Sequence, residues 1–277
     1  MKRSTILLPF IFGLLTTLMG TSALADEVSL IKADSRIHGR YGFSWQTYTA
    51  DILIENIARD KKVSMQYLDD DGQWKRQDAR FDHMIDNNKE VWRISETRML
   101  HHPNEPTQQP LNLTFALEYE VDGTVFWDNN HEQNYFLPAD SGEYIGSNIQ
   151  VDYAGALAPY DAQYGENSTH FDGRFSVGVL LKNLGYAKDV KVHYTLDNWK
   201  TTYVKDLTFQ YGRLVGYSWV TYPNANGVEY WSMTSTGEEM QDPTSNIVEY
   251  AVSYQVNGDT YWDNNFGRNY QIDIIHR

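Results

Sequence analysis

The chain has 277 residues, and its 23 Lys and Arg against 37 Asp and Glu give a formal net charge of −14. This acidic balance argues against nucleic acid or anionic lipid as a partner, because both require a basic binding surface. The chain contains no cysteine, which excludes disulfides, thiolate metal sites and a lipidated cysteine.

Residues 1–25 predict a secretory signal peptide. Lys2 and Arg3 form a positive end, an apolar run follows, and residues 23–25 (Ala-Leu-Ala) provide a small-residue cleavage site. An uncleaved membrane anchor is the alternative, but Gly, Pro and Thr interrupt the run, and its length is marginal for a lipid span. We therefore expect a mature chain that begins near Asp26, is secreted or periplasmic, and has no membrane attachment after cleavage.

The remainder of the chain contains two copies of one module. Residues 113–135 and 248–270 are identical at ten of 23 aligned positions, and both contain Trp-Asp-Asn-Asn followed by Asn-Tyr. Two earlier pairs of segments match in the same order, namely 52–67 with 179–194 and 90–94 with 229–233. Repetition of this kind indicates a duplicated module. We place the first module at 26–138, a linker at 139–147 and the second module at 148–277.

Each copy has the pattern of short antiparallel strands. Apolar residues alternate through 115–121 and 250–256, which is the period of a half-buried strand. Asp122-Gly123 and Asn257-Gly258 then predict tight hairpins, because primed turns need positive φ at both central residues. No segment has a convincing long helical period, and the 20 Tyr, 11 Phe and 8 Trp favour strands. The sequence therefore predicts an all-β protein.

The order of these motifs resembles that of family-21 carbohydrate-binding modules, which include the starch-binding domains of some fungal glucoamylases and the glycogen-targeting subunits of protein phosphatase 1. The second copy matches the family best, through Asn183-x-x-Tyr186-x-Lys188, a turn that ends on Trp199, Glu229-Tyr230-Trp231, and Trp262-Asp263-Asn264-Asn265. The first copy departs at Arg59, where the second has Tyr186, and it inserts a loop at 101–106. The resemblance implies two tandem immunoglobulin-like antiparallel β-sandwiches, and the strand spacing agrees. It also implies an α-glucan ligand such as starch, glycogen or a maltooligosaccharide.

A sugar ring has an apolar face and a polar rim, which a protein meets with exposed aromatic rings and amides. In the second module the resemblance implies Trp199, Trp262, Asn264 and Asn269 at one face, and Asn183, Tyr186, Lys188 and Tyr270 at a second face. In the first module it implies Trp74, Trp127, Asn129 and Asn134 at one face, and Asn56, Lys61 and Tyr135 at the other. Because Arg59 replaces a ring, we expect the second face to be weaker in the first module.

The other tryptophans divide into two groups. Trp92 and Trp231 are predicted to lie in the core, because the residues beside them alternate as in a buried strand. Trp45 and Trp219 have no counterpart in the other copy, and we assign them no role.

Catalytic chemistry has no clear signal. The chain lacks the nucleophile-elbow, zinc-protease and phosphate-loop motifs, and no catalytic pair, metal site or cofactor is predicted. Residues 191–194 (Lys-Val-His-Tyr) are the nearest match to a phosphatase-docking sequence, but they fall within a predicted strand. We therefore predict a non-catalytic α-glucan-binding protein, with a separately encoded glucan-active enzyme as a candidate partner. The alternative is an extracytoplasmic structural or adhesion sandwich that binds a protein or another polysaccharide.

Overall fold

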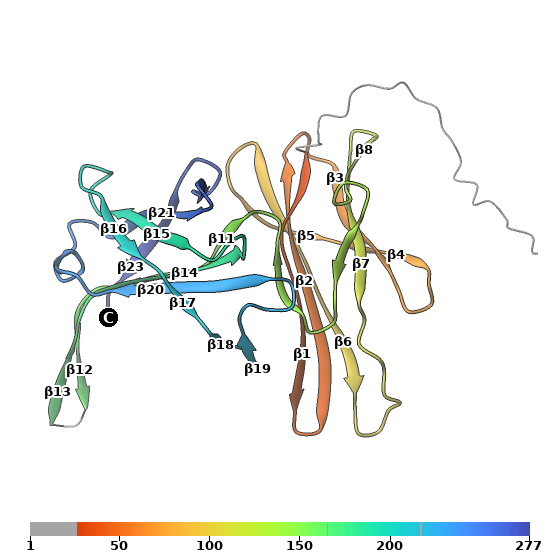
Figure 1. The fold of residues 1–277 in the computed structure, drawn as a ribbon, viewed down its shortest axis with the longest axis horizontal. Helices are drawn as coiled ribbons and strands as arrows, with labels where there is room; N and C mark the ends of the chain where they lie inside the picture. Colours follow the sequence, from red (N-terminus) through yellow and green to blue (C-terminus); the bar gives the residue numbers. More distant parts are fainter. Residues whose placement is uncertain (1–26, 165, 217) are drawn as a thin grey trace, which may run out of the picture.

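The computed structural model describes residues 27–164, 166–216 and 218–277, and these residues form two modules built from β-strands (Figure 1). Their one helical element is a 3-10 turn at Glu238–Met240. The predicted all-β class and the tandem antiparallel sandwiches are confirmed. Within the described ranges, no helix is long and apolar enough to cross a membrane. The predicted signal peptide lies outside them.

The first module consists of two antiparallel sheets. One has the strand order β10-β1-β2-β6-β5, and the other has the order β4-β3-β7-β8 with β9 also paired to β7. The strands are β1 (Val28–Arg40), β2 (Phe43–Glu55), β3 (Lys61–Leu68), β4 (Trp74–Asp78), β5 (Arg80–Met84), β6 (Lys89–His101), β7 (Leu113–Val121), β8 (Thr124–Asp128), β9 (Tyr135–Leu137) and β10 (Gly142–Ile145).

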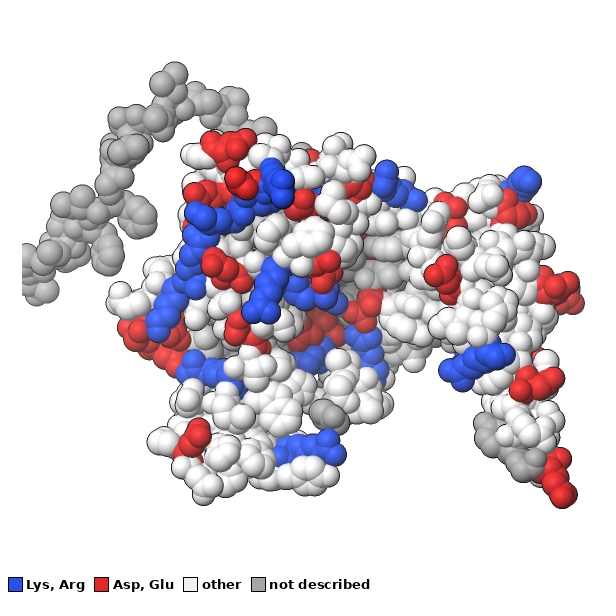
Figure 2. Space-filling model, turned by 180° about the vertical axis from the view of Figure 1, so that it is seen from behind, with Lys and Arg blue, Asp and Glu red and all other residues white. Residues whose placement is uncertain are grey.

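The second module repeats this arrangement. The order β11-β14-β20-β17 corresponds to β1-β2-β6-β5, and β16-β15-β21-β22 corresponds to β4-β3-β7-β8, while β23 joins the two sheets by pairing with β21 and β11. The strands are β11 (Ile149–Leu157), β12 (Tyr160–Tyr164), β13 (Asn167–Phe171), β14 (Arg174–Lys182), β15 (Lys188–Thr195), β16 (Tyr203–Asp206), β17 (Thr208–Gln210), β18 (Gly212–Val215), β19 (Ser218–Thr221), β20 (Val228–Ser235), β21 (Ile247–Val256), β22 (Asp259–Asp263) and β23 (Tyr270–Ile275). The hairpins β12–β13 and β18–β19 are additions, and the first of them projects from the module (Figures 1 and 2).

The alternating residues of β7 and β21 supply the centre of each core. Phe115, Leu117 and Tyr119 are buried in the first module, and Tyr250, Val252 and Tyr254 are buried in the second. Both predicted hairpin turns form with positive φ at their two central residues, including 49° at Asp122 and 53° at Asn257. The repeated sequence therefore produces a repeated core.

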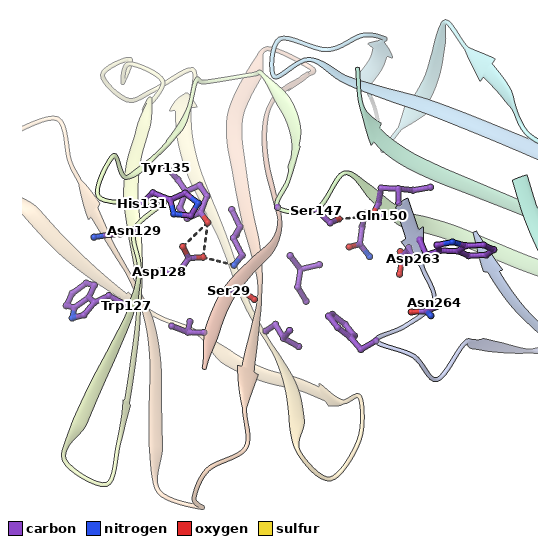
Figure 3. A pocket seen from close by; sticks show the side chains of 18 residues that line it. Ser29, Trp127, Asp128, Asn129, His131, Tyr135, Ser147, Gln150, Asp263 and Asn264 are labelled. Atoms are coloured by element: carbon purple, nitrogen blue, oxygen red, sulfur yellow. Dashed lines mark hydrogen bonds between the residues drawn. The ribbon is translucent and has the colours of Figure 1, made fainter. Parts of the chain in front are cut away.

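The aspartate of each Trp-Asp-Asn-Asn motif anchors the first strand of its module. Asp128 Oδ2 accepts a hydrogen bond from the Leu30 N–H at 2.9 Å (Figure 3). Asp263 Oδ2 accepts one from the Val151 N–H at 2.6 Å. In both modules this N–H lies beside an irregularity in the strand register, where an amide is left without a ladder partner. The motif thus has a structural role that is independent of any ligand.

The stretch predicted as a linker, 139–147, is itself structured. Its strand β10 pairs with β1 of the first module, from Ser35 opposite Gly142 to Lys32 opposite Ile145. The Ile145 side chain lies instead in an apolar cluster with residues of the second module: Leu180, Tyr222, Val228 and Tyr230. The connection is therefore shared by both modules and does not act as a free spacer.

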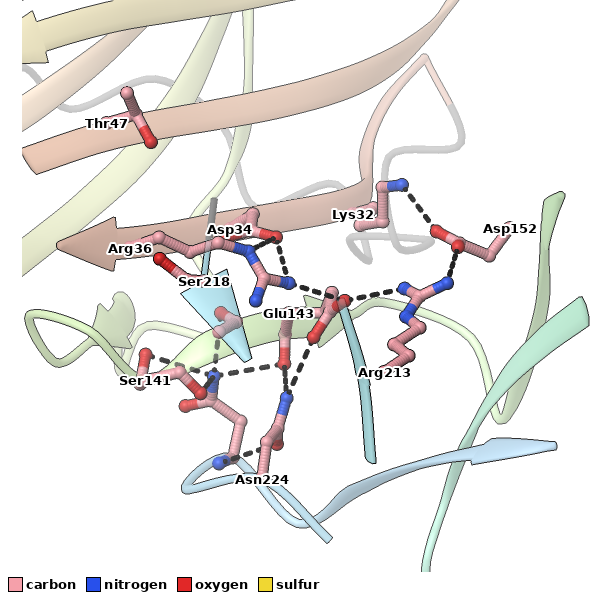
Figure 4. A network of polar contacts seen from close by, with 12 residues as sticks. Lys32, Asp34, Arg36, Thr47, Ser141, Glu143, Asp152, Arg213, Ser218 and Asn224 are labelled. Carbon is pink, nitrogen blue, oxygen red and sulfur yellow. Dashed lines mark hydrogen bonds and ion pairs between the residues drawn. The ribbon is translucent and has the colours of Figure 1, made fainter. Parts of the chain in front are cut away.

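A buried carboxylate holds the modules together beside this cluster. Glu143 Oε1 lies 2.5 Å from Arg36 Nη2 of the first module and 2.9 Å from Arg213 Nη2 of the second (Figure 4). It also accepts a hydrogen bond from the Tyr222 hydroxyl at 2.9 Å. Burial opposes ionisation, but the two guanidinium groups hold the pKa of Glu143 below its ordinary value. The carboxylate is therefore charged and paired across the interface.

The network extends to two further acidic groups. Asp152 accepts from Arg213 Nη1 at 2.6 Å and from Lys32 Nζ at 3.2 Å, which adds a second ionic link between the modules. Asp34 accepts from Arg36 Nε at 2.9 Å, yet burial and the nearby Glu143 raise the pKa of Asp34 to about 6, against the opposing effect of Arg36. Protonation of Asp34 is thus favoured by folding.

This shift predicts a pH-dependent effect of the substitution Asp34→Asn. A carboxyl whose pKa is raised on folding contributes stability below its unfolded pKa of 3.8, and that contribution is lost as the pH rises through about 6. The variant has no such proton to lose, so relative to the parent its free energy of unfolding should increase by roughly 2 kcal/mol between pH 4 and pH 7. Urea unfolding of both proteins at the two pH values measures the difference, and a difference that does not change with pH contradicts the prediction.

Candidate functional site

A hollow on the second module brings together the four residues expected at its first face. Trp199, Trp262, Asn264 and Asn269 line a volume of about 450 Å³, together with His193, Thr202 and Ala251. Trp262 lies on β22, and its side chain is 52% exposed. We call this group of seven residues the platform of the second module.

Glu249 on β21 positions two of the platform side chains. Its Oε1 accepts hydrogen bonds from the Trp199 indole N–H and from Asn269 Nδ2, the latter at 2.9 Å. Trp199 lies in a turn with a left-handed φ of 62°. Its backbone N–H donates to the Thr195 hydroxyl at 3.1 Å. The indole and the amide are therefore oriented before any ligand arrives.

The second tryptophan is supported from below by His193. The two rings lie 4.9 Å apart, and His193 Nε2 is 3.0 Å from the Ser253 hydroxyl. Burial, aided by the charge of Lys191, lowers the pKa of His193, so the imidazole is neutral at pH 7. The platform is thus built from neutral aromatic and amide groups.

The loop that carries the asparagines is rigid. Asn264 Oδ1 accepts from the Gly267 N–H at 2.9 Å, and its backbone carbonyl accepts from the Asn269 N–H at 2.7 Å. Positive φ values at Asn265, Phe266 and Asn269 accommodate the tight path. Asn264 lines the hollow while its side-chain oxygen is held by the loop backbone.

The structure brings together two residues expected at the second face of the first module, Asn56 and Lys61, and adds neighbours that the sequence did not suggest. In the first module Asn56, Arg59, Lys61, Phe81 and Trp92 are among the residues around a hollow of about 490 Å³. Here the predicted core position of Trp92 needs correction. Trp92 and Trp231 are half-buried, and each packs against its core on one side while the other side remains available.

One ion pair orients the half-buried tryptophan in each module. Glu90 accepts from Lys61 Nζ at 2.9 Å and from the Trp92 indole N–H at 2.8 Å. Glu229 likewise accepts from Lys188 Nζ at 3.1 Å and from the Trp231 indole N–H at 2.9 Å. The predicted binding residues Lys61 and Lys188 therefore also have a structural partner.

An edge-to-face aromatic contact completes each second face. The Phe81 and Trp92 rings are 6.1 Å apart, and the Phe209 and Trp231 rings repeat this spacing. Tyr186 is fully exposed in the loop between β14 and β15, and Asn183 in the same loop is also exposed. The first module has Arg59 at the corresponding position.

The two tyrosines that close the motif do not have the exposure expected of binding residues. Tyr135 is 8% exposed, stacks on Phe115 at 5.2 Å, and donates its hydroxyl to Asp128 at 2.8 Å. Tyr270 is half-buried and donates to Asp263 at 2.8 Å. Their expected placement at the second face is wrong, because both hydroxyls hold the aspartate that anchors the first strand, and Tyr135 lies at the cleft between the modules.

The first module does not reproduce the platform. Trp74 on β4 pairs with Leu68 on β3, which in turn pairs with Thr114 on β7. Trp127 on β8 pairs with Glu118, also on β7. The two tryptophans are therefore separated by three strand spacings across the sheet and by four residues along it. This corresponds to roughly 14 Å across the sheet and roughly 13 Å along it. The turn before Trp74 is two residues longer than the turn before Trp199, which moves the tryptophan into β4. Trp127 and Asn129 lie instead at a cleft between the modules, and Asn134 occupies a left-handed turn position beside them.

The model of the carbohydrate/starch-binding module (family 21) matches residues 43–138 and 166–273. Protein phosphatase 1 regulatory subunit 3B of Bos taurus is 29% identical over 177 residues, which cover 61% of this chain and 53% of that protein. Glucoamylase 1 of Rhizopus oryzae is 30% identical over 120 residues, which cover 42% of this chain and 17% of that protein. The chain thus spans about half the length of the phosphatase subunit.

One solved structure matches a single module. It is the starch binding domain of Rhizopus oryzae glucoamylase in complex with β-cyclodextrin and maltoheptaose. The identity is 25%, the match covers 44% of this chain and 100% of that chain, and the TM-score is 0.29.

The different burial of the two tryptophans in the second module predicts different costs of truncation. Trp231→Ala removes a ring that packs against the core and should destabilise the protein by about 2–4 kcal/mol. Trp262→Ala removes an exposed ring and should change the free energy of unfolding by less than about 1 kcal/mol. Urea unfolding of the two variants tests this order, which equal losses would contradict.

Proposed function

The chain belongs to family 21 of the carbohydrate/starch-binding modules, as its motifs predicted, and from this premise we propose that it is a non-catalytic α-glucan-binding protein. The observation that carries the proposal is the platform, where two tryptophans and two asparagines converge on one hollow. An exposed indole matches the apolar face of a sugar, and the amides match its hydroxyls. Preset orientation by Glu249 reduces the entropy lost on binding.

A neutral ligand fits the charge of the protein. Acidic and basic side chains are interspersed on the face shown in Figure 2, and the platform residues carry no formal charge at pH 7. Starch, glycogen and maltooligosaccharides are neutral polymers of the kind that this surface would accept. A structural or adhesion protein remains the alternative function, and binding of a protein or of a different polysaccharide would support it.

We further propose an extracytoplasmic location and service to a separately encoded glucan-active enzyme. The location rests on the signal-like sequence of residues 1–25 alone. The matched relatives include phosphatase subunits and give this location no support. A phosphatase partner would need an accessible docking segment. Val192 and Tyr194, the two hydrophobic residues of the nearest such sequence, are completely buried in β15 between β16 and β21.

Binding at the platform has a direct test. The purified protein should co-sediment with insoluble starch and not with cellulose or chitin. Trp199→Ala and Trp262→Ala should each lower the starch affinity by roughly tenfold or more, because each removes a stacking ring at the centre of the contact. Val204→Ala, at another exposed position of this module, is the matched control. Retention of full starch affinity by both tryptophan variants would refute the proposed site, and a preference for cellulose or chitin would refute the ligand.

The unequal second faces yield a gain-of-function prediction. Arg59→Tyr introduces the ring that the second module has at Tyr186, beside the hollow that already contains Trp92 and Phe81. Tyr has fewer rotamers to lose than Arg and stacks with less desolvation. In a Tyr186→Ala background, Arg59→Tyr should recover part of the lost maltooligosaccharide affinity, as measured by titration calorimetry. No recovery, in a variant that unfolds like its parent, would show that residue 59 does not face the ligand.

A further inference from the structure

A cleft of about 490 Å³ lies between the two modules and is lined by both of them. Figure 3 shows Trp127 and Asn129 toward one side of it, with Gln150 and Asn264 toward the other. The lining combines aromatic, amide and hydroxyl groups with five aliphatic residues, Val28, Leu30, Ile31, Leu53 and Ile149. Its two carboxylates, Asp128 and Asp263, are already engaged by the backbone of β1 and β11.

The cleft is bounded by equivalent positions of the two repeats. Trp127 corresponds to Trp262, and Asn129 corresponds to Asn264. The next lining residues in the two loops, His131 and Phe266, are equivalent as well. The same loop of each module therefore borders one shared space, although the first module has no platform of its own.

The cleft and the platform of the second module lie next to each other and share two lining residues. Trp262 and Asn264 line both hollows, so a ligand on the platform has one of its boundaries in common with the cleft. A compact ligand would occupy one hollow or the other. A linear polymer can occupy both and continue to the exposed ring of Trp127, which makes a long chain the occupant that suits this geometry.

The walls of the cleft are fixed relative to each other. Besides the Glu143 network, Arg268 donates to the Ile85 carbonyl at 3.2 Å and lies 3.6 Å from Asp86, and Lys89 Nζ lies 5.9 Å from the centre of the Phe266 ring. These three contacts join the motif loop of the second module to the first module. A polymer that entered the cleft would thus meet a preformed groove.

We infer that this cleft is a further subsite for a single α-glucan chain, which runs from the platform past Phe266 toward Trp127. The inference rests on the proposed function, since it concerns the path of the same ligand. It explains how a first module without a platform contributes to binding, because its motif loop acts as the far wall of the shared subsite. Contact with both the platform and the far wall of the cleft is available only to long chains, because a short oligosaccharide cannot span the two.

The test compares a long and a short glucan on a protein whose cleft is filled. Ser147 is exposed and lines the cleft, so Ser147→Trp places a large ring in it. Phe266→Ala is the second variant, and it removes a ring from the wall. Gln108→Trp, at an exposed position outside the cleft, controls for the added tryptophan. Soluble amylose and maltotriose are titrated into the parent and all three variants, and urea unfolding verifies that each variant is folded.

Ser147→Trp and Phe266→Ala should each weaken amylose binding by roughly tenfold or more, because a linked second contact is lost. Maltotriose affinity should be unchanged in every variant, and Gln108→Trp should match the parent with both ligands. If amylose affinity is unchanged in both cleft variants while maltotriose still binds, the cleft inference alone is overturned. If the parent binds neither glucan, the proposed function fails and the inference fails with it.

Discussion

The arrangement of the two modules depends on one buried carboxylate. Glu143 belongs to the strand that connects the modules, and it is paired with one arginine from each of them. A charge removed from water is tolerated only where its partners are close and well directed. Because the partners come from opposite sides, the carboxylate is satisfied in only one relative placement of the modules. The relative position of the binding surfaces on the two modules is therefore fixed as well.

Duplication kept the internal supports and changed the exposed groups. Asp128 and Asp263 hold the first strand in the same way, and Glu90 and Glu229 each bind a lysine and an indole. Glu249, by contrast, corresponds to Thr114, and Tyr186 corresponds to Arg59. The retained residues provide hydrogen-bond partners for buried polar groups, and a buried polar group without a partner destabilises any β-sandwich. The changed residues lie where solvent can replace a partner, so the modules were free to diverge in binding while their cores stayed alike.

Local patterns in the sequence predicted the hairpins, the duplicated core and the platform of the second module, because each depends on residues close in the chain or on a complete motif. Tyr135 and Tyr270 were misassigned, since the motif does not reveal that their hydroxyls turn inward to the aspartate. Trp92 was also misassigned, because strand alternation cannot distinguish a buried ring from one that is covered on a single side. The Glu-x-Trp spacing beside an equivalent lysine in both copies was the available signal. The cleft could not be predicted, because it arises from long-range contacts between modules.

Strand β10 has a consequence for the history of this chain. It completes a sheet of the first module, while Ile145 belongs to the apolar cluster of the second. No cut in the chain would return two intact ancestral units, since either product would lose a strand or expose that cluster to water. A tandem duplication normally leaves modules that recombination can separate and reuse. Here the connecting strand has become part of the fold of both modules, so the two modules can be passed on only together.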